Sequence, residues 1–396
     1  GHTTRTPFRM DLDVAVVGAS LGGLSAANVL HRLGARVVVF ECFCHGFHNR
    51  GGALGAVDVD LVRKIRGDVT GHRRPIKGHG HFYGDLWQYL YEGLPEGVVQ
   101  FGVDVQEILD SSSDSPQLLI GDDTRRFDLI VGADGGRSTV RKYVTDQLPT
   151  YAGYTVWRGL VPMAGIDGPP SGSTTIRGVQ YATLGFPCAG PPGAGDLWNC
   201  GVYMLMPVTE IEAPSRNRQV KSGMKSVPDW FVPFIRRFFG DWNAKFWQQC
   251  SDQGKVSPHP VWEFAADRVV ANRIVLLGDA AHMASPRTGA GAYTAMCDSV
   301  VLGEALQKEE TLGGALRRYN SSTVKRGKQL YQRSRAAAMS FAPPDCVPVS
   351  PLTLLEDALG HKLEDPPKVD SSREGKQSPV GFLARVISGP PCSSKD

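Results

Sequence analysis

Near the start of the chain, two short apolar runs flank a segment whose apolar residues recur at helical spacing. Residues 13–17 (DVAVV) and 36–40 (RVVVF) are apolar runs typical of strands buried on both faces. Between them, residues 24–33 place apolar side chains at helical spacing, and Gly34 follows as a stop. This strand–helix–strand order predicts a parallel pair of strands joined by a right-handed crossover.

Two further apolar runs, 128–135 (DLIVGADG) and 273–280 (RIVLLGDA), end in glycine and aspartate. Strands from such distant places predict one parallel sheet in an α/β, Rossmann-like nucleotide-binding domain that insertions interrupt. Residues 151–262 instead hold short alternating segments rich in Gly, Pro, Trp and Tyr, which indicate a mostly antiparallel sheet.

The predicted division of the chain follows from these patterns. A cofactor domain starts at 11–150, with a short insertion of the substrate domain around 65–84. The substrate domain covers 151–265, and 266–340 returns to the cofactor domain and ends in C-terminal helices. Residues 341–396 are rich in Pro and Ser and predict a loosely ordered tail.

One aromatic-rich segment inside the antiparallel region has helical spacing. Its large side chains fall on one helix face: Phe234, Phe238, Trp242, Phe246 and Trp247. A helix packed on the antiparallel sheet explains this pattern, and a membrane or partner surface is the alternative.

Composition narrows the function classes. The 396 residues are 41% hydrophobic and 21% charged, with a net charge of +3, which gives no reason to expect nucleic acid as a partner. No apolar run is long enough for a membrane span and no signal peptide is visible, so we expect a cytoplasmic protein. The eight cysteines include no CxxC pair, and no His/Cys spacing predicts a metal site.

The first chemical motif is VVGASLGGLSAA at 16–27. Gly18 and Gly23 permit a tight turn from strand to helix, and Ser20 stands at the middle position, with Leu21 opening the helix. The N–H groups at the start of such a helix favour a pyrophosphate. The motif therefore predicts a dinucleotide site.

Glu41 follows the second strand of this unit. A carboxylate there can accept hydrogen bonds from ribose hydroxyls, which favours FAD or NAD over NADP. A solvated strand end is the alternative interpretation.

The second motif, 128–142, carries Asp134 at a strand end and Arg141 in the next helical turn. The arginine could bind phosphates or could simply be solvated. In the third motif Asp279 at a strand end can accept hydrogen bonds from ligand hydroxyls, and Pro286 makes the following loop rigid. The next helix starts with small residues whose bare N–H groups suit a reduced flavin: Gly289, Ala290, Gly291 and Ala292.

In this order, the three motifs resemble the single-component FAD-dependent aromatic hydroxylases, the para-hydroxybenzoate hydroxylase superfamily. The stretches 82–87 (FYGDLW), 149–161 (PTYAGYTVWRGLV) and 266–281 (ADRVVANRIVLLGDAA) are similar to the 2,6-dihydroxypyridine hydroxylase branch. The resemblance spans about residues 11 to 340. It implies an NAD(P)H-consuming monooxygenase that hydroxylates a phenol or hydroxypyridine with dioxygen through a flavin C4a-hydroperoxide.

The resemblance also assigns residues. It implies FAD with its pyrophosphate at Gly18–Gly23, its ribityl chain on Asp279 and its ring against Pro286 and 289–292. Arg50 is expected near the phosphates, Val105 near the adenine, and Asp134 and Arg141 near FAD and NADH or NADPH. Members of the family are often homodimers.

The catalytic and substrate residues are expected on less specific grounds. His48 is a candidate base on the loop after Glu41, and Tyr181 and Tyr203 are candidates for the pocket wall. The sequence departs from the family in the short, Gly/His/Arg-rich segment 65–84. An FAD-binding protein that has lost hydroxylase activity is therefore the alternative function.

Overall fold

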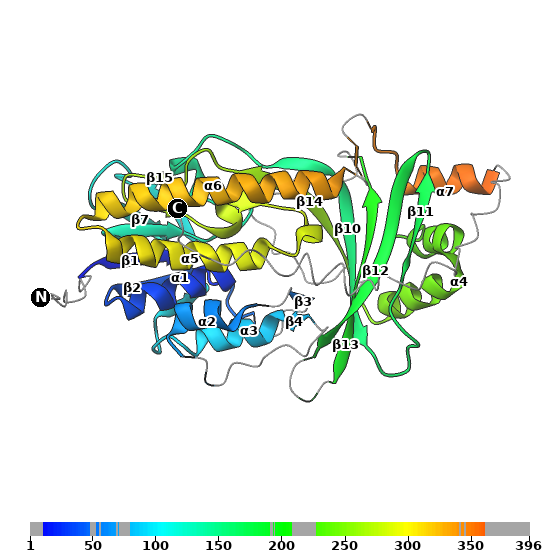
Figure 1. Cartoon of the computed structure of the whole chain (residues 1–396), viewed down its shortest axis with the longest axis horizontal. Coiled ribbons are helices and arrows are strands. Elements are labelled where there is room, and N and C mark those ends of the chain that lie inside the picture. The colour runs from blue at the N-terminus through cyan, green and yellow to red at the C-terminus, as the bar shows by residue number, and fades with distance from the viewer. Residues whose placement is uncertain are drawn as a thin grey trace, which may run out of the picture.

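The computed structural model describes most of the chain, and two sheets organise it (Figure 1). The described residues are 11–47, 53–54, 57–68, 70, 80–190, 193, 195–207, 227–339, 342–343 and 346–360. Helices α1, α5 and α6 lie at the end of the molecule that contains the first sheet, and α4 and α7 lie beyond the second.

The first sheet has six strands in the order β15-β16-β9-β1-β2-β5, and all its pairs are parallel except β15 with β16. Its strands are β1 (Asp13–Val17), β2 (Arg36–Glu41), β5 (Val99–Phe101), β9 (Leu129–Gly132), β15 (Val270–Ala271) and β16 (Ile274–Leu276). Helix α1 (Leu21–Arg32) connects β1 to β2. Segments far apart in sequence thus form one sheet, as the apolar runs predicted.

The second sheet is antiparallel throughout, in the order β11-β12-β13-β10-β14-β17. Its strands are β10 (Thr150–Pro162), β11 (Gly172–Ile176), β12 (Val179–Ala189), β13 (Asp196–Leu205), β14 (Val256–Ala265) and β17 (His282–Met283). The edge strand β17 lies within the third motif, between Asp279 and Pro286. The chain therefore passes from the tip of β16 straight into the second sheet.

Helix α4 (Phe231–Asp252) packs on the second sheet, which confirms the expected aromatic helix face. Phe234, Phe246 and Trp247 are buried, because they insert between the helix and the strands. Trp242 departs from the prediction, since 43% of it is exposed. A kink at Gly240, where φ is +86°, changes the helical register before Trp242 and turns this side chain out of the interface.

Helices α5 (Gly291–Lys308) and α6 (Leu312–Ala338) cover the first sheet (Figure 1). Helix α6 has 27 residues and is therefore about 40 Å long. Near its start, Asn320 Oδ1 accepts a hydrogen bond of 2.8 Å from the N–H of Val269 in the first domain. Near its end, Arg335 binds Glu263 of β14 at 2.9 Å. One helix thus contacts both sheets.

Shorter elements complete the described chain. They are α2 (Val59–Arg66), α3 (Tyr83–Tyr91), the pair β3 (Ala53–Leu54) and β4 (His81–Phe82), and the three-stranded sheet of β6 (Val105–Leu109), β7 (Gln117–Ile120) and β8 (Asp123–Arg126). Within the unusual segment 65–84, the structure describes the end of α2, strand β4 and the start of α3, while residues 71–79 lie outside the described part.

The C-terminal region differs from the expected loose tail. Residues 351–360 form helix α7 (Pro351–Gly360), whose Leu354 and Leu355 are buried in the core of the second sheet. Asp357 pairs with Arg177 on the sheet side. The apolar spacing of this helix outweighs the Pro-rich composition around it; residues 361–396 lie outside the described part.

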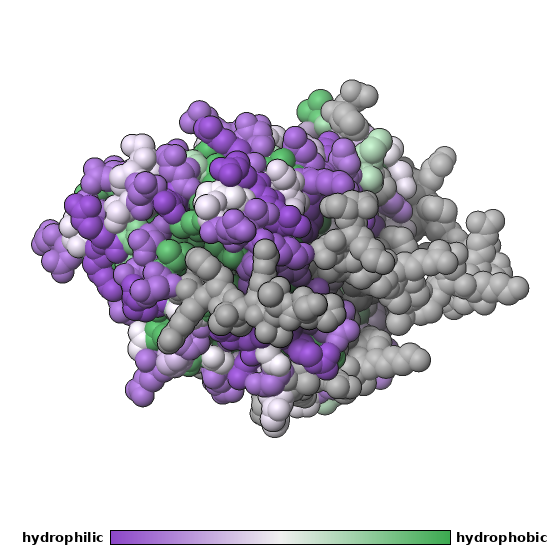
Figure 2. Space-filling model, turned by 60° about the vertical axis from the view of Figure 1, so that its left-hand side comes forward, coloured by the Kyte–Doolittle hydropathy of each residue, from purple (hydrophilic) through white to green (hydrophobic). Residues whose placement is uncertain are grey.

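Figure 2 shows the end of the molecule that is formed by the first sheet and its helices. The described surface there is mostly hydrophilic. Within the described residues, none of the helices combines the length and the apolar character that a membrane crossing requires.

Candidate active site

The carboxyl ends of four parallel strands meet at one edge of the first sheet. β16, β9, β1 and β2 are neighbours, and Val17 is level with Phe40 and Gly132, which is level with Leu276. Gly18, Asp134 and Asp279 therefore follow strand ends on the same edge, where Glu41 is the last residue of β2. The outer strands β16 and β2 are three spacings apart, about 14 Å. An extended ligand could lie across this edge.

The glycines of the first motif are required by close backbone contacts. Gly18 has a φ of +101°, and a Cβ there would lie 2.5 Å from the carbonyl oxygen of Ala133. A Cβ on Gly23 would lie 1.9 Å from the carbonyl oxygen of Gly18. Only glycine fits at both positions, so the turn brings the start of α1 tightly against the strand ends.

Helix α1 begins without a side-chain cap and without an acid in its first turn. Ser20 stands at the N-cap, but its hydroxyl lies 2.7 Å from the Tyr83 hydroxyl instead of bonding the helix backbone. Leu21 is buried in the core. The backbone N–H groups of the first turn and their partial positive charge are thus available to an anion such as a pyrophosphate.

Helix α5 begins in the same way, with Ala290 at an uncapped N-cap and no acid in the first turn. A Cβ placed on Gly291 would have no neighbour within 4 Å, so the first turn borders open space. The loop before it is shaped by Pro286 and by Gly289, whose φ is +60°. Asp58 caps α2 and Thr311 caps α6, whereas α3 and α4 also begin without a side-chain cap. Open space beside bare N–H groups fits a flat ring that carries negative charge.

Glu41 is buried, with only 4% of it exposed, which excludes a solvated strand end. Its Oε2 accepts a hydrogen bond of 2.8 Å from the N–H of Ala19, and its Oε1 accepts one of 3.0 Å from the N–H of Phe43. The carboxylate therefore joins the glycine turn to the loop after β2. The Cys42 thiol also donates to Oε1, at 3.4 Å, so Oε2 is the oxygen with a second lone pair, and a bond to ribose stays a prediction.

Val105, expected near an adenine, starts strand β6 and is buried. Two residues earlier, the N–H of Val103 donates a hydrogen bond of 2.9 Å to the carbonyl of Glu41. Val105 thus follows a segment bound to the end of β2.

Asp134 organises the turn that follows β9. Its carboxylate accepts hydrogen bonds from the Ser138 hydroxyl at 2.5 Å, the Thr139 N–H at 2.6 Å and the Val140 N–H at 3.2 Å. Burial raises the pKa of Asp134, although these hydrogen bonds favour the charged form. The side chain thus has a structural role in the turn, and its contact with a cofactor stays a prediction.

Arg141 joins the second motif to the third. Its Nε donates to the carbonyl of Ala280 at 2.8 Å and its Nη2 to that of Asp279 at 2.7 Å. Its Nη1 and Nη2 donate to Gly136 at 2.8 Å and Gly135 at 3.4 Å. Burial lowers the pKa of Arg141, while the nearby carboxylates of Asp134 and Asp279 act in the opposite sense. The guanidinium holds two loops together from inside, and phosphate binding stays a prediction.

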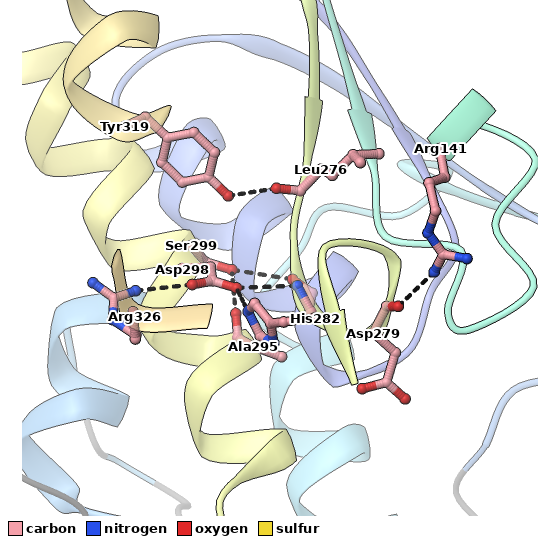
Figure 3. A network of polar contacts seen from close by, with 11 residues as sticks. Arg141, Leu276, Asp279, His282, Ala295, Asp298, Ser299, Tyr319 and Arg326 are labelled. Carbon is pink, nitrogen blue, oxygen red and sulfur yellow. Dashed lines mark hydrogen bonds and ion pairs between the residues drawn. The ribbon is translucent and has the colours of Figure 1, made fainter. Parts of the chain in front are cut away.

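The side chain of Asp279 is exposed. Figure 3 shows its carboxylate pointing away from Arg141. Arg141 instead donates a hydrogen bond to the backbone carbonyl of Asp279. The backbone of Asp279 is therefore anchored while its carboxylate is presented at the sheet edge.

A buried ionic network lies beneath the third motif (Figure 3). Asp298 of α5 accepts hydrogen bonds from the Gly278 N–H at 3.1 Å and from Arg326 at 2.8 Å, and its Oδ2 lies 2.6 Å from His282 Nε2. Burial alone would lower the pKa of His282, but the Asp298 carboxylate outweighs it and the pKa is raised. Burial acts to raise the pKa of Asp298, yet His282 and Arg326 hold it below its usual value.

Sequence reasoning missed Asp298. One acid inside the apolar run AMCDSVVL (295–302) was the available signal, because a buried charge needs partners. His282 has a structural role in this network, because its Nε2 lies 2.6 Å from the Asp298 carboxylate.

The two candidate tyrosines lie on opposite faces of the second sheet. Tyr203 pairs with Ala182, whereas Tyr181, one residue earlier on β12, points the other way. The Tyr181 ring lies 5.9 Å from that of Phe234 on α4, so it belongs to the helix side. Tyr203 faces the opposite side, where the Arg287 guanidinium lies 5.4 Å from its ring centre. The structure does not bring both tyrosines to one pocket.

Two predicted site residues, His48 and Arg50, lie outside the described residues. Their expected roles as base and phosphate ligand therefore stay predictions.

The fold and the site together define a dinucleotide-binding protein. A second, antiparallel sheet lies beside the edge where the carboxyl ends of the parallel strands meet. The sequence matches the family described as FAD binding domain over residues 95–334, and the chain belongs to this family. The predicted resemblance and α/β fold class are thereby confirmed.

Curated relatives are monooxygenases. The chain is 27% identical over 378 residues to 3-amino-4-hydroxybenzoate 2-monooxygenase of Streptomyces cremeus, covering 85% of this chain and 89% of the relative. It is 24% identical over 352 residues to 2,6-dihydroxypyridine 3-monooxygenase of Paenarthrobacter nicotinovorans, covering 79% and 87%. The prediction of an FAD-dependent monooxygenase, rather than a protein without activity, is confirmed.

Solved structures share the fold. The 2,6-dihydroxypyridine-3-hydroxylase from Arthrobacter nicotinovorans superimposes with a TM-score of 0.69 at 20% identity, covering 87% of this chain and 95% of that one.

Proposed function

We propose that this FAD-dependent monooxygenase hydroxylates an electron-rich aromatic ring, a phenol or a hydroxypyridine, and consumes dioxygen and NADH or NADPH. The observation that carries the proposal is the pair of uncapped helix N-termini, α1 and α5, at the same edge of the first sheet. The start of α1 suits a pyrophosphate, and the start of α5 suits a ring that carries negative charge. The aromatic substrates in the names of the relatives support the same class of acceptor.

FAD, when bound, supplies the oxygen-transfer chemistry, which no side chain of the protein can provide. The residues that would hold it follow from the geometry. Gly18 to Gly23 and the start of α1 would receive the pyrophosphate, with Glu41 and Val105 at the adenosine end. Asp279 would bind the ribityl hydroxyls, and Gly289 to Ala292 would border the ring.

The protein itself has to orient the substrate and exclude water. The Tyr154 hydroxyl of β10 lies 2.5 Å from the Ser285 hydroxyl, so the second sheet is tied to the loop before α5. Pro286 at the start of the next turn makes this loop rigid. The sheet face that carries Tyr154 and Tyr203 would then cover the ring side of the site.

Two finer expectations accompany this proposal. The cysteines within the described residues are all free thiols, which supports a reducing compartment such as the cytoplasm, where NADH and NADPH are available. A homodimer, common among related hydroxylases, would be tested by light scattering of the purified protein.

The function is tested with the purified, FAD-loaded protein. A panel of phenols and hydroxypyridines is added with NADH or NADPH, and cofactor oxidation, hydroxylated product and hydrogen peroxide are measured separately. We expect at least one aromatic compound to accelerate NAD(P)H oxidation and to appear as hydroxylated product. A yellow protein whose NAD(P)H oxidation no aromatic compound accelerates would overturn the proposal and restore the alternative without hydroxylase activity.

A further inference from the structure

Ser20 stands at the start of α1 but does not cap this helix. Its backbone is extended, with a φ of −77° and a ψ of −176°, as is typical of an N-cap residue. A serine there normally accepts a hydrogen bond from the second or third N–H group of the helix. Asp58 and Thr311, in the same position before α2 and α6, do accept such bonds. The uncapped start of α1 therefore has a cause other than the type of residue at its N-cap.

Tyr83, the first residue of α3, offers the Ser20 side chain a different partner. The two hydroxyl oxygens lie 2.7 Å apart, and only 8% of Tyr83 is exposed. The Ser20 hydroxyl is therefore directed toward α3 and away from the backbone of α1. This direction is the same whichever of the two hydroxyl groups donates the proton.

The backbone next to Ser20 is held in place from two sides. One turn further along α3, Trp87 Nε1 donates a hydrogen bond of 2.7 Å to the carbonyl of Ala19. The N–H of Ala19 donates to Glu41 Oε2 at 2.8 Å. Because both groups of Ala19 are bound, the next residue keeps its position relative to α3.

The start of α3 is fixed by the second sheet. Tyr83 comes at the end of the unusual segment 65–84, where the N–H of Gly80 donates a hydrogen bond of 2.9 Å to the carbonyl of Pro187 in β12. Phe82 is buried in a small cluster with residues of β12 and β13. The hydroxyl of Tyr83 is thus presented to the turn after β1 by contacts that do not involve α1.

We propose that Tyr83 is a positioning residue for FAD. Its hydroxyl holds the Ser20 side chain away from α1, so that the N–H groups of the first turn bind the pyrophosphate. Without this contact the serine hydroxyl can turn and cap the helix, and the cap competes with the pyrophosphate for the same donors. The inference rests on the proposed function, which places the FAD pyrophosphate at α1, and deepens it by assigning a role to a residue that acts through Ser20.

The test measures FAD affinity. The full chain is freed of FAD and titrated with it, and quenching of flavin fluorescence gives the dissociation constant. Y83F keeps the buried ring and removes one hydroxyl. We expect Y83F to bind FAD about three- to tenfold more weakly, because the new cap has to be broken before the pyrophosphate binds. The melting temperature of FAD-free Y83F should stay close to that of wild type, since the cap replaces the lost hydroxyl contact.

A double variant shows whether Tyr83 acts through Ser20. S20A removes the side chain that could cap the helix, so S20A and S20A/Y83F should bind FAD with equal affinity. The double variant should also bind FAD more tightly than Y83F alone. A purely structural role of Tyr83 predicts no such rescue, because loss of a second hydroxyl would not repair the fold.

Y89F is the matched control, because Tyr89 lies on the same helix and its hydroxyl donates to the carbonyl of Asp68 at 3.2 Å. It should leave the affinity for FAD unchanged.

Two outcomes would overturn the inference: Y83F binds FAD as tightly as wild type, or Y83F weakens FAD binding equally with and without the Ser20 hydroxyl. These results are distinct from failure of the proposed function. The expected pattern of FAD affinities without any hydroxylated product would uphold the role of Tyr83 and reject the hydroxylase. Hydroxylated product from a protein whose FAD affinity does not respond to Y83F would do the reverse.

Discussion

His282 Nε2 lies 2.6 Å from Asp298 Oδ2, and the two side chains, 1% and 0% exposed, are sealed beneath the loop that presents Asp279. The same Asp298 oxygen accepts a hydrogen bond from the Gly278 N–H at 3.1 Å. Arg326 of α6 binds the other oxygen at 2.8 Å. The buried acid therefore fixes the backbone directly before Asp279, while Arg141 fixes it from the opposite side.

The first prediction concerns the pH dependence of stability. The pKa of His282 is raised in the folded protein, so its charged form stabilises the fold below the unfolded pKa, about 6.5. This contribution is lost as the pH rises through the folded pKa. H282Q keeps a hydrogen-bond donor but no charge, and should cost about 3 kcal/mol near pH 6 and less at alkaline pH.

Urea unfolding of wild type and H282Q between pH 5.5 and 9 checks this dependence. Asp298 has a lowered pKa, so its own contribution persists across this range and is lost only in acid, as the pH falls through its folded pKa. A difference between the two proteins that grew with pH would contradict the assigned charge state of His282.

The second prediction separates the structural role of Arg141 from a contact with phosphates. R141K keeps the charge but cannot reach four carbonyl groups, so we expect a loss of about 2–4 kcal/mol in the free energy of unfolding even without FAD. Thermal unfolding of the FAD-free protein measures it. K142Q, at the exposed neighbouring position, should be nearly neutral. Unchanged stability of FAD-free R141K, together with weakened FAD binding, would instead assign the arginine to the phosphates.

The third prediction tests the open space beside α5. A Cβ on Gly291 meets no protein atom within 4 Å, so G291V should fold with a stability within about 1 kcal/mol of wild type. The same side chain should occupy the space proposed for the flavin ring and weaken FAD binding by at least about tenfold. Quenching of flavin fluorescence measures the affinity.

Gly313 offers the matched control for G291V, since it is an exposed glycine in the first turn of α6. G313V should preserve both stability and FAD affinity. Equal FAD affinity in G291V and G313V would exclude a flavin ring at the start of α5.

The fourth prediction uses the two faces of the second sheet. Y181L should lower the free energy of unfolding by about 2–3 kcal/mol, because the ring packs against Phe234. Its affinity for aromatic ligands should stay the same. Y203L should weaken the binding of the same aromatic ligands in calorimetric titrations. A loss of affinity in Y181L as large as in Y203L would contradict this division of roles.

The parallel sheet could be predicted from the sequence because its strands are short apolar runs and its turns need glycine. Gly18 and Gly23 show this directly, since a Cβ at either position would collide with a backbone oxygen. The acids at the strand ends could also be placed on one edge of the sheet, because parallel strands present their carboxyl ends together.

The parts that could not be predicted depend on partners far away in the chain. In the sequence, Asp298 is a single acid within an apolar helical segment. Only the fold shows that Arg326, on the next helix, lies against it. Tyr181 and Tyr203 each alternate correctly within their strands, but the face that each occupies depends on how β12 and β13 are paired. Helix α7 was not predicted, because prolines surround it in the sequence. Leu354 and Leu355 were the available signal of a buried side.

The length of helix α6 restricts how the molecule can admit a substrate. This single rod is bonded to the backbone before β15 through Asn320 and to strand β14 through Arg335. Any rocking of one sheet against the other would have to bend the rod or break the buried contacts of Glu263. Entry and exit of ligands are therefore expected to rely on rearrangement of loops around a rigid two-sheet frame.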